Sequence, residues 1–159
     1  MPGAPPLSGS AAAGMPAIDP SVWQRLQQAQ AAAQLQPGDF GTLVNLGNTA
    51  YDAREFAQAI DAYEKALKIE PGDANVMTDL GTAYRNVGQH DKALEHFRRA
   101  RAKDPKHWQS LYNEVIVLAL DRHEHEAADA ALARLKAEHP GLPAIAELER
   151  QIGAAHGGK

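Results

Sequence analysis

The stretch LGTAY at residues 80–84, with the small and aromatic residues that follow it, decides the fold of this chain. Leu46-Gly47 precedes Leu80-Gly81 by 34 residues. The same interval separates four further pairs, namely Ala59 and Ala93, Tyr63 and Phe97, Ala66 and Ala100, and Pro71 and Pro105. A fixed period of this size predicts an array of helical hairpins, in which each unit buries its neighbour.

Composition narrows the classes of protein to consider. The 159 residues carry a formal net charge of −4, and the basic residues are interleaved with acids. We expect no nucleic-acid partner, because nucleic-acid binders usually show a clustered basic face. Cysteine is absent, which excludes disulfides and thiolate chemistry but fits either redox compartment. The longest apolar run, residues 115–120, is too short to span a bilayer, so we expect a soluble domain without direct membrane insertion.

Residues 1–18 are rich in Pro, Gly, Ala and Ser and contain few large apolar side chains. This composition predicts a disordered tether. One interpretation is a leash to something upstream, such as a membrane anchor, and the other is a frayed chain end. No signal-peptide pattern is visible at the N-terminus. The sequence does not indicate the cellular compartment.

The array is predicted to occupy residues 19–153. Residues 19–36 form an N-terminal half-repeat with one helix, which Asp19 or Ser21 caps. The first full unit covers 40–73, with helices at 41–53 and 56–69, and the second covers 74–107. Gly47 leaves room where two helices cross, and Tyr63 fills the space beside it. Gly88 suits a turn with a positive φ.

The third unit, residues 108–141, departs from this pattern. Ala127 falls 34 residues after Ala93, but Glu114-Val115 stands where Leu-Gly is expected, and Ala131 replaces the second aromatic residue. The helix expected at 112–120 is apolar nearly all round, which predicts burial on every side. Its partner is a capping helix at 143–153, because terminal units must shield the exposed end of an array. Residues 154–159 are predicted to be a disordered tail.

These residues resemble the tetratricopeptide repeat (TPR) family, whose motif has Leu-Gly, an aromatic residue, Ala, an aromatic residue, Ala and a closing Pro. The second unit supplies all of them, and the first has Ala50 in place of the first aromatic residue. The resemblance implies an all-α fold, a right-handed superhelical α-solenoid with a C-terminal capping helix. It also implies a concave groove, lined by the first helix of each unit, that holds a peptide of another protein.

The predicted peptide-binding groove starts from Asn45, Asp79 and Asn113, which precede successive Leu-Gly positions at the 34-residue interval. Side-chain amides in a row offer a donor and an acceptor to the backbone of an extended peptide. A similar asparagine ladder occurs in O-linked N-acetylglucosamine transferase. The other residues expected to line the groove are Asn48, Tyr51, Asp52, Asn75, Thr78, Thr82, Arg85, Asn86, Gln109, Tyr112 and Ile116.

The sequence lacks most residues of the carboxylate clamp, with which heat-shock co-chaperones bind the C-terminal carboxylate of a peptide. The resemblance places Asn48 at one clamp position. The other four positions, where Lys, Asn, Lys and Arg are expected, hold Val44, Asp79, Gln109 and Asn113. A C-terminal carboxylate would also meet the acidic Asp79, so the clamp is not expected.

Catalytic and metal sites are not predicted. The run His123-Glu124-His125-Glu126 lacks the i, i+4 spacing that places two ligands on one helical face. No Ser-His-Asp order, phosphate-binding loop or paired-carboxylate cleft is apparent. We therefore expect neither an enzyme nor a cofactor.

The function predicted from the sequence is a non-catalytic scaffold that binds an extended or helical peptide segment of a partner protein. The family resemblance extends to bacterial modules that serve assembly tasks at membranes, including cytochrome c maturation. An alternative is an oligomerisation module, in which the apolar helix of the third unit meets its twin in a homodimer.

Overall fold

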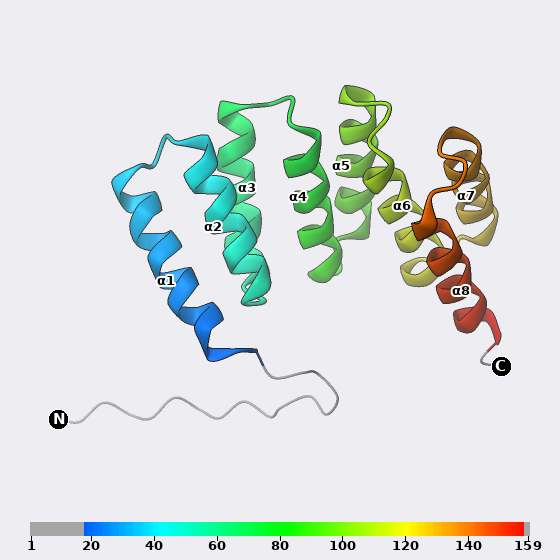
Figure 1. Cartoon of the computed structure of the whole chain (residues 1–159), viewed down its shortest axis with the longest axis horizontal. Helices are drawn as coiled ribbons and strands as arrows, with labels where there is room; N and C mark the ends of the chain where they lie inside the picture. The colour runs from blue at the N-terminus through cyan, green and yellow to red at the C-terminus, as the bar shows by residue number, and fades with distance from the viewer. Residues whose placement is uncertain (1–17, 158–159) are drawn as a thin grey trace.

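The computed structural model describes residues 18–157, and this range is built from helices without a β-strand. The helices are α1 (Pro20–Leu35), α2 (Phe40–Asp52), α3 (Phe56–Ile69), α4 (Ala74–Asn86), α5 (His90–Lys103), α6 (Trp108–Ile116), the π-helical turn η1 (Val117–Asp121), α7 (His125–Glu138) and α8 (Pro143–Gly157). Helices α1 to α7 follow one another along the long axis of the molecule, and α8 turns back to pack against α6 (Figure 1). The predicted α-solenoid with a C-terminal capping helix is confirmed. The tether predicted at residues 1–18 lies, apart from Ile18, outside the described residues.

Three helices begin at side chains placed one repeat apart. The Asp39 carboxylate accepts from the Thr42 backbone N–H at 2.7 Å, and Asp73 accepts from the Val76 N–H at 2.8 Å. In the third unit His107 takes this position, and its Nδ1 accepts from the Ser110 N–H. Each cap satisfies a backbone donor that the first helical turn leaves free. The repeat therefore sets where the first helix of each hairpin starts.

The two helices of each full hairpin approach most closely at a glycine. A Cβ atom added to Gly47 would lie 2.4 Å from the Tyr63 ring, and one added to Gly81 would lie 2.6 Å from the Phe97 ring. Both rings are buried against the bare backbone of the facing helix. The prediction that Gly47 leaves room for Tyr63 is confirmed. Gly88, in the turn between α4 and α5, also has the positive φ predicted for it.

The third hairpin contains one residue more than the other two. The Gln89 N–H donates to the Tyr84 carbonyl five residues back, whereas the equivalent bond, from Glu124 to Leu118, spans six residues. The π-helical turn η1 takes up the extra residue, since each of its turns is wider than an α-helical one. The single α-helix expected at 112–120 is therefore wrong, because α6 ends at Ile116.

The extra residue shifts the register of α7. Ala128, 35 residues after Ala93, is buried, whereas Ala127 is exposed. Our alignment of Ala127 with Ala93 was therefore wrong by one residue. The same shift places Leu132, and not Ala131, at the position of Phe97.

Helix α8 covers the end of the array. Its Ile145 and Leu148 share an apolar cluster with Leu111 and Val115 of α6, so the predicted cap is confirmed. This helix continues to Gly157, and the predicted disordered tail is wrong for residues 154–157. None of the helices in the described range has the length and hydropathy of a membrane span.

Candidate functional site

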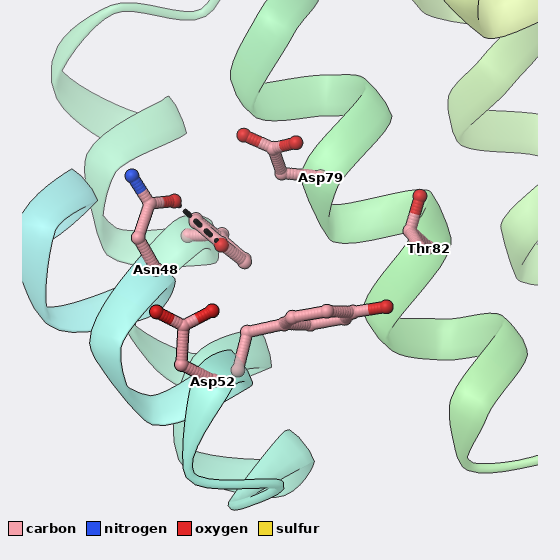
Figure 2. A pocket seen from close by; sticks show the side chains of 6 residues that line it. Asn48, Asp52, Asp79 and Thr82 are labelled. Atoms are coloured by element: carbon pink, nitrogen blue, oxygen red, sulfur yellow. Dashed lines mark hydrogen bonds between the residues drawn. The ribbon is translucent and has the colours of Figure 1, made fainter. Parts of the chain in front are cut away.

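A cavity of about 190 Å³ opens between the first helices of the two full hairpins. Figure 2 shows Asn48 and Asp52 of α2 on one side, facing Asp79 and Thr82 of α4 on the other. The cavity has six lining residues, namely Asn48, Tyr51, Asp52, Tyr63, Asp79 and Thr82. Because helical residues three or four positions apart share a face, each helix offers its two polar side chains to the same space. We call this the α2–α4 cavity.

Hydrogen bonds fix the orientation of the groups around the cavity. The Tyr63 hydroxyl donates to Asn48 Oδ1 at 2.8 Å (Figure 2). The Asn86 amide donates to the Tyr51 hydroxyl at 2.9 Å, which ties α2 to α4. The Thr82 hydroxyl donates to the Thr78 carbonyl at 2.9 Å. The side-chain carbonyl oxygen of Asn48 thus already accepts one hydrogen bond. The amide N–H groups of Asn48 take no part in the bond to Tyr63.

The two carboxylates of the cavity differ in their surroundings. Asp52 lies 3.9 Å from Arg25, and both side chains are more than half exposed, so water screens this pair. Asp79 is partly buried and, within the described residues, makes no hydrogen bond or ion pair. Burial, with the charge of Asp73 as a smaller cause, raises the pKa of Asp79 to about 6. Burial also raises the pKa of Tyr63, which keeps its hydroxyl protonated as a donor.

Of the fourteen residues predicted for the groove, five line this cavity: Asn48, Tyr51, Asp52, Asp79 and Thr82. Asn86 adjoins them through its hydrogen bond to Tyr51. Two of the remaining residues are held by partners elsewhere. Asn75 Oδ1 lies 3.0 Å from His107 Nε2, and Arg85 binds both carboxylate oxygens of Asp121.

The predicted ladder does not form a continuous row in this cavity. Asp79 lines the cavity, whereas Asn45 and Asn113 do not. The Asn113 amide donates to the Gln109 carbonyl of its own helix, and Tyr112 packs against the Trp108 ring. Asn45 and Gln109 are exposed.

Two predicted lining residues are buried and do not line the α2–α4 cavity. Thr78 is 5% exposed and Ile116 is 8% exposed. The Thr78 hydroxyl donates to the Ala74 carbonyl of its own helix. Ile116 belongs to the apolar cluster under α8.

Sequence reasoning missed the contribution of Tyr63, which was assigned to the core alone. Its ring is core, but its hydroxyl reaches the cavity. The sequence did contain an indication, because the first unit has Tyr63 where the second has Phe97. A buried tyrosine hydroxyl needs a polar partner, and a phenylalanine does not. Asp121, the partner of Arg85, had no such signal, since the extra residue in η1 hides its register.

The histidine run lies at the start of α7. His123 and His125 have ring centroids 6.1 Å apart. Among residues 18–157, no group of three His, Cys, Asp or Glu side chains is arranged to hold a metal ion.

Two protein-family models match the chain, and both describe tetratricopeptide repeats. One matches residues 50–115 and the other residues 24–74, so together they cover α1 through most of α6. None of the curated proteins matches the chain.

Solved structures share the fold at low sequence identity. The crystal structure of MamA has a TM-score of 0.71 at 22% identity, covering 84% of this chain and 75% of MamA. The type III secretion chaperone SycD of Yersinia enterocolitica, in complex with a peptide of the translocator YopD, has a TM-score of 0.64 at 18% identity, with coverages of 72% and 87%. The first TPR of Spaghetti (RPAP3), bound to the HSP90 peptide SRMEEVD, has a TM-score of 0.64 at 19% identity, with coverages of 74% and 93%.

Proposed function

The chain belongs to the tetratricopeptide repeat family, and we propose that it is a non-catalytic scaffold that holds a peptide segment of a partner protein along the face formed by α2, α4 and α6. The observation that carries the proposal is the α2–α4 cavity, where polar groups of two successive repeats converge. A peptide lying across both repeats would bridge them and cover the cavity.

Comparison of folds supports the kind of ligand. Two proteins with a similar fold, SycD and RPAP3, were solved with peptides of their partners. The analogy concerns the fold, so the peptide chemistry for this chain has to come from its own residues. The six cavity residues include two carboxylates and no His, Cys or Lys. We infer binding without catalysis from the analogy with SycD and RPAP3, which were solved with bound peptides.

The alternative of an oligomerisation module is not favoured. The apolar segment that would form the homodimer contact comprises α6 and η1. Other helices of the same chain cover it, and Val115 and Val117 are fully buried. A homodimer through this helix would first require α8 to leave. The link to assembly tasks at membranes depends on the predicted tether, and we retain it as part of the proposal.

Obstruction of the cavity tests the proposal. An arrayed library of random peptides provides ligands, and fluorescence anisotropy then measures their affinity for the whole chain. Thr82→Arg should abolish binding, because its long side chain enters the cavity from α4. Asp61→Arg on the exposed face of α3 is the control and should bind like the wild type. If Thr82→Arg binds the peptides as tightly as Asp61→Arg and the wild type do, the α2–α4 cavity is excluded as the peptide site.

A further inference from the structure

We infer that the α2–α4 cavity selects a cationic side chain, Lys or Arg, in the bound peptide. This inference rests on the proposed function and gives the ligand class of the same site. Its basis is a cavity with two carboxylates whose charge residues 18–157 leave largely uncompensated.

No basic residue is among the six that line the cavity. Arg25 lies 3.9 Å from Asp52, outside hydrogen-bond distance and in an exposed setting. Arg85 is the next basic residue on α4 after Thr82, and Asp121 holds it with two hydrogen bonds of 2.5 Å and 3.1 Å. The nearby arginines therefore leave the cavity negatively charged.

Asp79 is the group that indicates an absent partner. Partly buried carboxylates in proteins are usually paired or hydrogen-bonded, because removal from water is costly for a charge. Asp79 has no such partner in the described part of the chain. Its equivalents in the neighbouring units are the neutral Asn45 and Asn113, so the repeat itself does not require an acid here. Burial and Asp73 raise its pKa to about 6, and a bound cation would lower it again.

The remaining surface of the cavity suits a long basic side chain. Tyr51 lines the cavity, and an aromatic face attracts cations and covers methylene stems. A cavity of about 190 Å³ has room for one side chain rather than for a helix. An acidic side chain would instead meet two carboxylates, and its Coulomb energy would be unfavourable.

The test compares peptides and protein variants in one assay. The arrayed library is probed with the whole chain in the presence of EDTA, so that a bridging metal ion cannot take the place of a basic residue. Lys or Arg should be enriched among the peptides that bind. Each selected peptide is then made with norleucine or Glu in place of its basic residue.

Three variants remove one negative charge each. Asp79→Asn and Asp52→Asn act inside the cavity, and Asp61→Asn is the matched control on the outer face of α3. Asp79→Asn should weaken the basic peptide about tenfold to a hundredfold, the usual worth of a charge-assisted hydrogen bond. The norleucine peptide should bind wild type and Asp79→Asn equally, and Asp61→Asn should change neither affinity.

The outcomes separate this inference from the proposed function. Some peptides without a basic residue could still bind, compete with the basic peptide and fail to bind Thr82→Arg. This result would overturn the cation preference but leave the scaffold function supported. Equal affinity of the basic peptide for wild type and Asp79→Asn would do the same. A library without any binder would overturn both.

Discussion

The second and third repeats solve the same packing problem with different side chains. In the second repeat the Phe97 ring lies over Gly81, where a Cβ atom would come within 2.6 Å of it. In the third repeat Val115 follows Gly81 by 34 residues and is buried, and Leu132, at the position of Phe97, packs against the same apolar cluster. Two aliphatic side chains thus replace the glycine and the ring. The aromatic residue itself is therefore not required at this position of the fold.

The largest effect should come from removal of the ring. Phe97 is fully buried, so Phe97→Ala should lower the free energy of unfolding by about 3–5 kcal/mol. Leu132→Ala, at the equivalent position of the third repeat, should lower it less, because Leu132 is only partly buried. Urea denaturation followed by circular dichroism measures both. A larger loss for Leu132→Ala would mean that the third repeat, and not the second, carries the tighter packing.

An exchange of the two solutions sharpens the comparison. Gly81→Val alone should cost about 1–3 kcal/mol, because its side chain enters the space of the Phe97 ring. The double variant Gly81→Val/Phe97→Leu recreates the third-repeat pair and should recover part of this loss. A double-mutant cycle gives the coupling between the two sites. Strict additivity would show that the volumes at this crossing are not interchangeable.

Glu114 is the second difference between these repeats, since it stands where the second has Leu80. It is buried, and it accepts from Arg98 at 2.8 Å and from Arg101 at 2.6 Å. Glu114→Ala should destabilise the chain by about 1–3 kcal/mol, because both arginines lose their partner. Glu114→Leu should lose less than Glu114→Ala, because the Leu side chain fills part of the space even though both arginines still lose their partner. A loss with Leu as large as with Ala would make the ion pair itself indispensable; thermal denaturation compares the two.

Asp79 and Asn113 form the third contrast, and its effect depends on pH. The pKa of Asp79 is raised to about 6 from 3.8, so folding favours the protonated acid. The stability that this preference contributes is present below pH 3.8 and is lost as the pH rises through about 6. Asp79→Asn should therefore raise the free energy of unfolding at neutral pH by about 1–2 kcal/mol, allowing for partial exposure of the group. Denaturation at neutral and acidic pH measures the gain, which should vanish in acid, whereas a gain that is independent of pH would rule out ionisation as its cause.

The smallest effect concerns the turn between the two helices of a hairpin. Gly88 has a φ of 76° there, and Arg54, one repeat earlier, has a φ of 61°. This region is costly for a residue with a side chain, so Arg54→Gly should stabilise the chain by about 0.5–1 kcal/mol. The reverse change, Gly88→Arg, should lose a similar amount. Chemical denaturation resolves both; a loss with Arg54→Gly would show that contacts of the Arg54 side chain outweigh the backbone term.

Much of the candidate site could be predicted, because helical position and period fix which residues share a face. Asn48, Asp52, Asp79 and Thr82 were placed together on this basis, and they line one cavity. The same reasoning did not show that Ile116 is buried, since the path of the capping helix decides how far that face is covered. It also could not show that Asp79 lacks a partner among the described residues, because this depends on side chains from other helices.

The sequence by itself determined the hairpin array, its period and the glycine–aromatic crossings, because these follow from contacts repeated at one interval. Only the tertiary structure decided the π-helical turn, the burial of Glu114 beside two arginines, and the cavity between α2 and α4 in which Asp79 has no partner from residues 18–157. The physical reason is that these features depend on packing between different helices, and not on the pattern within one of them. A local pattern specifies which face a residue occupies, but the neighbouring helices decide whether that face meets water, a partner or an empty space.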